Sequence, residues 1–531
     1  MRYVVGLLAC FLLIGAERPV LMALGKTPPN QAVAKIKRDM DYLCGERLQG
    51  RQTGLEGELL AAQYIEGRFK GIGLQPWRGS YTDGFSLNTG LRPSPQANLA
   101  IDGHALSIGT EAILLPYSKW GVIKGLCYPG VPEKKNVWLI SLKSFQAEWG
   151  TNIQAALYLK AKSAQEAGAG SVVFYNDTEQ QIELQQTLLQ LFPTLDIPVI
   201  WVTAAAWTKY AVPAMKNDWV DIEGRVAFED ALLNGQNVMG YINNQALYTT
   251  VIIAHYDHIG AGFTGADDNA SGVAALLSLA EQIKSSGLKR YNYLFVALSG
   301  HEQNNEGARV LIQRNDSLWS SVSAVFELDM LGRFNPVSRE VYVAGAGTSS
   351  LWNQVLQLGG KGFDLQVDSS GYTLTDAQLF YEKKLPVLRL STGYHNDFRR
   401  PGDNLDKVNL NDMPELMQGL FRIVAESDKL ARPLFVKTND YFQKMKNLRG
   451  TLEIIPDVVW PGEGLRVAAV FPDKKSDRAG MKSGDVITKL GVYPIYDMDD
   501  YLEAIRKTET GREVNVKIRR GEQEFTFYIN L

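Results

Sequence analysis

Four apolar runs in the second half of the chain each end in polar residues that carry chemistry. They are the runs 249–254, 293–298, 323–328 and 385–390. Segments with the apolar spacing of helices, such as 272–287, lie between them. Continuous apolar strands that alternate with helices are typical of a mostly parallel sheet sandwiched by helices. The pattern therefore predicts an α/β fold over residues 236–432.

The residues that follow these runs include histidines and carboxylates, which can bind metal ions or transfer protons. In sheets of this kind, ligands bind beyond the carboxyl ends of the strands. We therefore expect the four strand ends to meet at one site. In chain order they carry His255-Tyr256-Asp257-His258, then Ser299-Gly300-His301-Glu302, then Asp329, and finally Ser391-Thr392-Gly393-Tyr394-His395.

The rest of the chain divides into further segments. Residues 31–75 have the apolar spacing of two helices, the second of which ends at Gly71 and Gly73. Residues 110–235 contain a strand–helix–strand pattern and no catalytic constellation. Residues 440–531 alternate short strands with one helix at 497–508, which predicts a separate small module.

The first residues are typical of a targeting segment. Met1-Arg2 precedes the apolar stretch 4–16, which is too short to span a bilayer comfortably. This pattern favours an export signal over residues 1–25, with an uncleaved membrane anchor as the alternative. No later run reaches about 18 apolar residues, so we expect no stable membrane span in the mature chain and a periplasmic or secreted location.

The composition limits which partners and which kinds of metal site we expect. The 531 residues include 55 basic and 58 acidic ones, and the formal charge of −3 gives no reason to expect a nucleic-acid partner. The cysteines, at 10, 44 and 127, lack the paired spacing of zinc–thiolate sites, and whether Cys44 and Cys127 pair is left open. Because there are only five histidines, a metal site must combine histidine with carboxylates.

The strand-end residues suit zinc, which accepts histidine nitrogen and carboxylate oxygen. Asp268 stands in a turn before a helix, where its carboxylate could bridge two ions. The alternative is that this turn merely caps the helix, but the donors at the other strand ends favour a metal site. We expect His258 to be a supporting or solvated residue rather than a ligand, and His104 to lie on the surface.

Several motifs together resemble metallopeptidase family twenty-eight, the co-catalytic zinc exopeptidases that are mostly aminopeptidases. The resemblance implies the zinc exopeptidase fold, with residues 31–109 as the N-terminal part of the peptidase domain. Residues 110–235 resemble a protease-associated insert, and residues 440–531 resemble a PDZ domain. The motifs are HYDH at 255–258, GADDNASGVAALL at 265–277, SGHE at 299–302, ELDMLGR at 327–333 and TGYHNDFRRPGDNLDK at 392–407.

The resemblance implies roles for five residues. His255, Asp268 and Asp329 match one zinc site, in which Asp268 is the bridging carboxylate. Asp257 matches the residue that orients the first histidine. Glu302 matches a ligand of the second zinc.

Two positions depart from the family pattern. His301 stands where the family has its general-base glutamate, and Arg399 stands where it has a histidine ligand. Arginine has no acceptor atom and cannot ligate zinc, but its charge could take the second-metal position and pair with Glu302 and Asp268. We therefore expect one zinc ion rather than two, with His301 as candidate proton acceptor. His395 is not assigned as a replacement ligand.

The resemblance implies peptides or protein termini as partners. PDZ domains bind peptides as an added strand. Glu453 stands where that family prefers glycine, which leaves two roles open: capture of a C-terminal peptide, or a structural or lid role. The leading hypothesis is an exported zinc aminopeptidase-like hydrolase with an altered site. The alternative is an inactive pseudopeptidase that binds peptides or protein partners.

Overall fold

The computed structural model describes residues 29–148, 153–178, 192–217, 219–439, 441–446, 448 and 450–531. The expected export signal at 1–25 lies outside these residues. The chain forms two compact units, one of residues 1–85 and 235–531 and the other of residues 86–234. Among the described helices, none combines the length and the apolar character needed to cross a bilayer.

A large mixed sheet forms the centre of the first unit. Its strand order is β1-β11-β13-β12-β14-β17-β15-β16, with β2 also paired to β11. The central strands β13, β12, β14 and β17 run parallel, as the apolar runs predicted. The bounds are β1 Gln75–Pro76, β2 Thr82–Pro93, β11 Phe228–Ile242, β12 Thr249–His255, β13 Asn292–Leu298, β14 Val322–Leu328, β15 Glu340–Ala344, β16 Asp364–Val367 and β17 Val387–Ser391.

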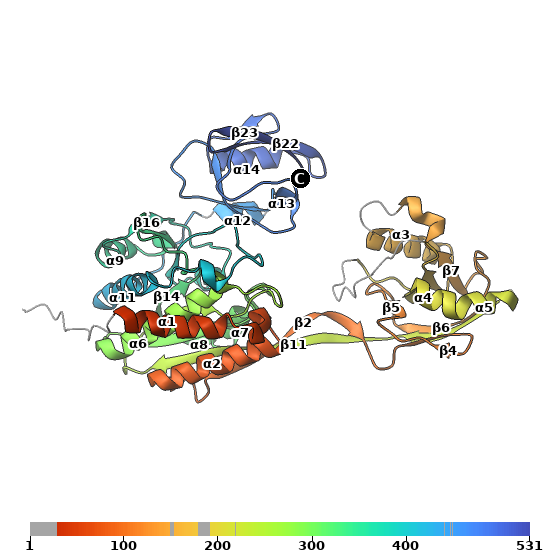
Figure 1. The fold of residues 1–531 in the computed structure, drawn as a ribbon, viewed down its shortest axis with the longest axis horizontal. Helices are drawn as coiled ribbons and strands as arrows, with labels where there is room; N and C mark the ends of the chain where they lie inside the picture. The colour runs from red at the N-terminus through yellow and green to blue at the C-terminus, as the bar shows by residue number, and fades with distance from the viewer. Residues whose placement is uncertain are drawn as a thin grey trace, which may run out of the picture. The chain divides into compact units, whose positions relative to one another are not determined.

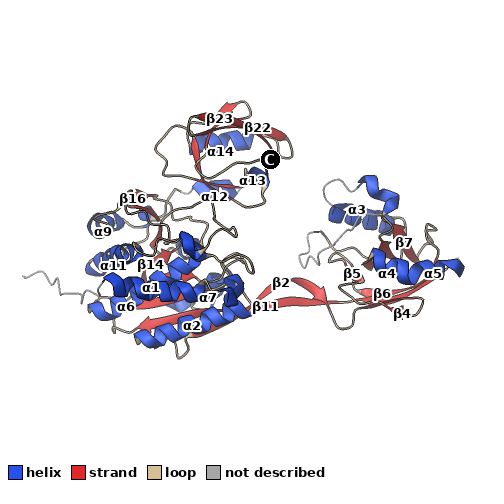
Figure 2. Cartoon of the chain, in the orientation of Figure 1, coloured by secondary structure: helices blue, strands red, loops and turns tan. Residues whose placement is uncertain are grey.

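Helices cover both faces of this sheet (Figures 1 and 2). The core under one face draws on α1, α2, α6, α9 and α11, and the core under the other draws on α7, α8 and α10. Gly73, with φ +81°, ends α2 in the left-handed region that glycine adopts without strain. The bounds are α1 Pro29–Leu43, α2 Glu56–Ile72, α6 Gly272–Ser286, α7 Glu306–Arg314, α8 Asp316–Trp319, α9 Trp352–Gly359, α10 Asp376–Glu382 and α11 Met413–Lys429.

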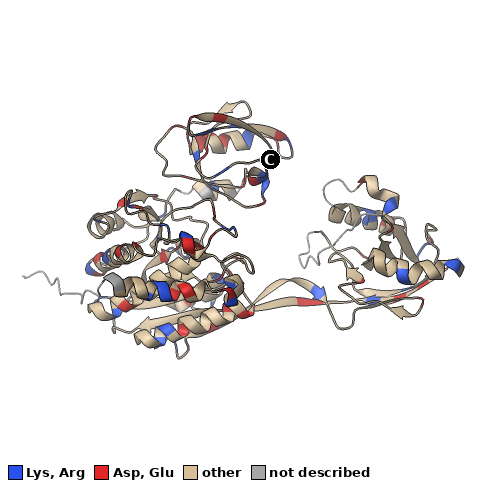
Figure 3. Ribbon diagram, in the orientation of Figure 1, with Lys and Arg blue, Asp and Glu red and all other residues tan. Residues whose placement is uncertain are grey.

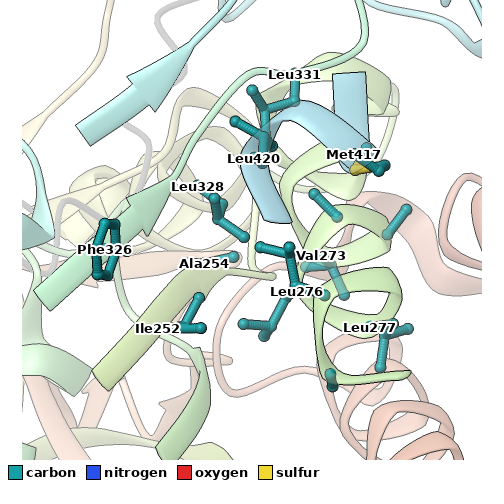
Figure 4. Packing of buried hydrophobic residues seen from close by; sticks show 14 of the residues in the cluster. Ile252, Ala254, Val273, Leu276, Leu277, Phe326, Leu328, Leu331, Met417 and Leu420 are labelled. Carbon is teal, nitrogen blue, oxygen red and sulfur yellow. The ribbon is translucent and has the colours of Figure 1, made fainter. Parts of the chain in front are cut away.

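The parallel strands are held by a fully apolar interior. In Figure 4, side chains of β12 and β14 such as Ile252 and Phe326 face those of α6 and α11. Val273, Leu276 and Leu420 in this cluster are completely buried. Because such close packing resists displacement, it gives the strand ends fixed positions.

Residues 86–234 form a unit with its own core. Strands β7, β8 and β9 are parallel and α3 connects β7 to β8, as the strand–helix–strand pattern predicted. The unit starts before the predicted boundary at 110, because β3 pairs with β10 in one sheet. The main bounds are β3 Asn98–Ile101, β5 Ala112–Leu114, β6 Gly121–Cys127, β7 Val137–Ser141, α3 Ile153–Glu166, β8 Ser171–Tyr175, β9 Val199–Val202 and β10 Val220–Val226.

The C-terminal residues build a small β-rich module with one longer helix. Its strands follow the order β18-β19-β20-β22-β23 and enclose a separate apolar core. The helix predicted at 497–508 forms as α14, one residue shorter at each end, among short strands as expected. The bounds are α12 Tyr441–Lys446, β18 Ile454–Pro456, β19 Leu465–Val470, α13 Lys475–Arg478, β20 Val486–Leu490, β21 Tyr493–Pro494, α14 Met498–Lys507, β22 Glu513–Arg520 and β23 Gln523–Asn530.

Charged residues of both signs are interspersed on the outer helices (Figure 3). On α1 and α2, for example, Arg68 pairs with Asp39 and also with Glu281, the latter at 2.7 Å. This mixing agrees with the nearly neutral formal charge of the sequence.

Candidate metal centre

The carboxyl ends of three neighbouring parallel strands bring the predicted residues together. His255 is the last residue of β12, His301 and Glu302 follow β13, and Asp329 follows β14. Asp268 lies in the irregular helical turn Ala266–Ser271 that opens α6. The convergence expected from the sequence is therefore present.

Hydrogen bonds from other loops hold the turn that carries Asp268. The carboxylate of Asp403 accepts from the backbone N–H groups of Asp267, at 3.0 Å, and Asp268, at 2.9 Å. The side chain of Asn269 accepts from the backbone N–H of Gly272 and of Met330, each at 3.0 Å. These bonds fix the turn against the segment after β14, so the Asp268 carboxylate has a defined direction.

His255, Asp268 and Asp329 form a buried group with the geometry of a metal site. Nε2 of His255 lies 3.3 Å from Oδ1 of Asp268 and 3.6 Å from Oδ1 of Asp329. Nε2 of His255 and Oδ1 of Asp329 are both buried without a hydrogen bond. Buried polar atoms are rarely left unpaired, so these atoms fit a cation between them. One nitrogen and two carboxylate oxygens are a donor set that zinc accepts.

The ring of His255 is oriented by the backbone of Asp257 rather than by its side chain. Nδ1 of His255 lies 3.1 Å from the carbonyl oxygen of Asp257 but 3.8 Å from its carboxylate. The carboxylate instead accepts from the hydroxyl of Thr53 and from the backbone N–H groups of His301 and Glu302. Asp257 therefore holds both the histidine and the turn after β13.

Arg389 on β17 supports the other end of this group. Its Nε and Nη2 donate to Oδ2 of Asp329 at 3.0 and 2.7 Å, which leaves Oδ1 directed at His255. Burial together with the charges of Asp329 and Asp376 raises the pKa of neighbouring Glu327 to about 7. The sequence analysis did not assign a role to Arg389 or to Glu327.

A second group consists of His258, Asp268 and Glu302. Nδ1 of His258 lies 3.4 Å from Oε1 of Glu302 and 3.9 Å from Oδ2 of Asp268. The side chain of His258 is completely buried. Of the two expected positions, supporting or solvated, the solvated one is wrong, because the loop after β12 turns the ring of His258 inward toward the carboxylates.

His301 lies next to the first group and is held by a carboxylate. Its ring stacks on that of His255, with centroids 3.8 Å apart. Its Nδ1 lies 2.9 Å from Oδ2 of Asp376, at the start of α10. The sequence offered no neighbour to orient His301, because Asp376 is far away along the chain.

Arg399 and His395 bind different carboxylates. The guanidinium of Arg399 pairs with Oε2 of Glu302, as its charge suggested. Nε2 of His395 lies 3.1 Å from Oδ2 of Asp267, outside both groups. His395 therefore supports the turn before α6 and belongs to neither group.

The charges of the site keep its central carboxylates ionised. Burial acts to raise the pKa of Asp268, but the nearby ring of His255 and the charges of His258 and Arg399 hold that pKa well below its usual range. Burial is likewise outweighed at Asp329, whose pKa is lowered by the charge of Arg389 and by the nearby ring of His255. Both carboxylates are thus in the form that binds a cation.

Arg51 was also missed, although it braces the loop after β12. It is fully buried and donates to the carbonyl oxygens of Leu43, Tyr256, Thr264 and Gly265 at distances from 2.6 to 2.9 Å. No sequence signal marks Arg51 for this role, because three of its four acceptors lie more than 200 positions away along the chain.

The fold and the paired histidine–carboxylate groups define an α/β domain with a candidate metal centre at its strand ends. Residues 237–424 match the profile of peptidase family M28, and residues 436–531 match that of the PDZ domain. The chain thus carries a peptidase family M28 domain followed by a PDZ domain, as the motifs predicted.

Several characterised proteins share parts of this sequence. The BOS complex subunit NCLN of Gallus gallus is 37% identical over 114 residues, which are 19% of this chain and 20% of that protein. Mitochondrial serine protease HTRA2 of Bos taurus is 35% identical over 74 residues, 14% of this chain and 15% of that one. Aminopeptidase YwaD of Bacillus subtilis (strain 168) is 27% identical over 198 residues, 35% and 39% respectively. The chain therefore spans well under half the length of these relatives.

Two solved aminopeptidase structures align with part of this chain. The zinc aminopeptidase BSAP from Bacillus subtilis aligns with a TM-score of 0.44 and 19% identity, over 78% of this chain and 98% of that one. The aminopeptidase from Aneurinibacillus sp. strain AM-1 aligns with a TM-score of 0.42 and 18% identity, over 77% and 96%.

Proposed function

We propose that the chain is an exported, zinc-dependent exopeptidase of the aminopeptidase type that hydrolyses peptides at an altered metal site. The observation that carries this proposal is the group of His255, Asp268 and Asp329, in which Nε2 of His255 and Oδ1 of Asp329 are buried without a hydrogen bond. The M28 domain and the similarity to an aminopeptidase of Bacillus subtilis support the reaction class.

Three residues would hold the zinc ion, namely His255 through Nε2 and Asp268 and Asp329 through carboxylate oxygens. Zinc in such a site polarises a peptide carbonyl and lowers the pKa of bound water. Asp257 and Arg389 keep the first histidine and the last carboxylate in place, the role that supporting hydrogen bonds play around metal ligands.

His301 is the proton acceptor in this proposal. When Nδ1 carries the hydrogen that it shares with Asp376, the lone pair of the ring is at Nε2. Imidazole held by a carboxylate in this way is an arrangement that serves general-base catalysis in other enzymes. His301 would thus take over the role of the glutamate that the family has at this position.

The location and the partners complete the proposal. The apolar stretch at 4–16 is the basis for export to the periplasm or beyond the cell. The PDZ domain would bind peptides or protein termini, which are also the substrates of the peptidase domain.

The test is hydrolysis of aminoacyl-p-nitroanilides by the full chain, before and after treatment with a zinc chelator. We expect hydrolysis that chelation abolishes and added zinc restores, and an Asp329→Asn variant with at least about 100-fold lower kcat/KM. The exposed Asp316→Asn variant is the matched control and should behave as wild type. Hydrolysis that survives chelation would overturn the proposal, and so would a folded chain that binds no zinc and cleaves no aminoacyl substrate.

A further inference from the structure

His258 is a buried histidine without a hydrogen bond. Both of its ring nitrogens are buried and unpartnered. The nearest acceptor atoms facing Nδ1 are Oε1 of Glu302 and Oδ2 of Asp268, which are themselves buried without a hydrogen bond. These three atoms come from three different segments, face one another and have no hydrogen-bond partner. A protein interior does not keep such an arrangement of polar atoms without a binding partner.

The separations between these atoms suit a shared metal ion. Ligand atoms about 2.0–2.2 Å from a tetrahedral zinc lie roughly 3.3–3.6 Å from each other. In the His255 group the measured separations are 3.3 and 3.6 Å. In the His258 group they are 3.4 and 3.9 Å. The second group therefore has nearly the dimensions of the first, and Asp268 contributes one oxygen to each.

Arg399 leaves the facing oxygen of Glu302 free. The guanidinium pairs with Oε2, whereas Oε1 is the oxygen that faces His258. Because arginine has no acceptor atom, it cannot act as a ligand. Arg399 holds Oε2 of Glu302, the oxygen that does not face His258. Because its positive charge repels a nearby cation, a metal ion in the His258 group binds more weakly than one in the His255 group.

We propose that His258 supplies the nitrogen ligand of a second divalent-metal site, with Asp268 as the bridging carboxylate and Glu302 as the third ligand. The ligand comes from the loop after β12, three residues beyond His255, and not from the loop after β17 that holds Arg399. This inference rests on the proposed function only in that zinc is taken as the first metal.

The test is zinc binding by the metal-stripped full chain, followed by calorimetric titration and by metal analysis after desalting. Wild type should bind two zinc ions per chain, the second at least about tenfold more weakly. His258→Ala should retain the tight ion and lose the weak one. His104→Ala is the matched control, since His104 is exposed and belongs to neither group, and should retain both ions.

A second variant separates loss of a ligand from loss of folding. Arg399→Met removes the opposing charge, so it should tighten the weak site about tenfold and leave the tight site unchanged. Thermal unfolding of each metal-free variant checks that it is folded. A His258→Ala variant that binds two ions as wild type does would overturn the inference, as would a wild type that binds only one. Binding of no zinc at all would instead contradict the proposed function.

Discussion

Nδ1 of His301 lies 2.9 Å from the carboxylate of Asp376, so the histidine at the general-base position is held by a residue of α10. The ring of His301 also stacks on the ring of His255, with their centroids 3.8 Å apart. These two contacts together fix the position of the second ring nitrogen of His301. In the proposed mechanism, this pair gives the site a proton acceptor where the family has a glutamate.

Asp376 should act as a positioning residue. Asp376→Asn should lower kcat for aminoacyl-p-nitroanilides about 10- to 100-fold with little change in KM, because the amide can hold the wrong tautomer of His301. Zinc content should stay at the wild-type value. Asp364→Asn, an exposed carboxylate on β16, serves as the control. Equal kcat in Asp376→Asn and wild type would contradict the role of the pair.

Arg389 should control zinc affinity through Asp329. Its two hydrogen bonds go to one oxygen and leave the other for the metal. Arg389→Lys keeps the charge but loses the fork of two donors, so zinc should bind about 10- to 100-fold more weakly. Competition with a coloured chelator measures this change. An unchanged zinc affinity in a folded Arg389→Lys variant would show that the Asp329 carboxylate needs no such support.

Arg51 should contribute to stability rather than to the reaction directly. Arg51→Met leaves three buried carbonyl oxygens and one part-buried one without their donor, which should lower the free energy of unfolding by about 3 kcal/mol or more. Denaturant titration of the full chain measures this loss. The exposed Arg47→Met is the control and should change the free energy by less than about 0.5 kcal/mol. A similarly small change in Arg51→Met would contradict the bracing role.

The two cysteines of the described residues, Cys44 and Cys127, are free thiols with low reactivity. Burial raises the pKa of each to about 12. At pH 8, iodoacetamide should label them slowly in the folded chain and rapidly after unfolding, as followed by mass spectrometry. The thiol pKa is higher in the folded chain than its unfolded value near 9. The stability that comes from keeping these buried thiols protonated is therefore complete below about pH 9 and is lost between about pH 9 and 12. Rapid labelling of the folded chain, or a disulfide between Cys44 and Cys127 found by mass spectrometry, would contradict this account.

Glu453 should weaken capture of C-terminal peptides by the PDZ domain. It has φ +55°, in the region that favours glycine, and its carboxylate accepts from the backbone N–H of Lys475 at 3.1 Å. Glu453→Gly removes a negative charge beside a loop amide, so a peptide with a free C-terminus should bind several-fold more tightly by fluorescence anisotropy. The same peptide with an amidated C-terminus should show no gain. Equal gains for both peptides would exclude repulsion of the carboxylate as the cause.

Much of the fold followed from periodicity, because the apolar runs before His255, His301 and Asp329 had to be buried strands with their polar ends at one edge. The meeting of His255 and Asp329 was therefore predictable. The contacts of Asp376 and Arg389 were not, because each meets the site through tertiary contacts with residues 60 or more positions away. For His258 the sequence left a supporting and a solvated position open, since only the path of its loop decides whether the ring faces inward or outward.

The most direct test of the metal centre is a crystal structure of the full chain grown with zinc, with anomalous scattering measured on both sides of the zinc absorption edge. The account predicts a strong peak between His255, Asp268 and Asp329, and a weaker one between His258, Asp268 and Glu302. Zinc-edge peaks only elsewhere on the protein, or none where these side chains are well ordered, would contradict it.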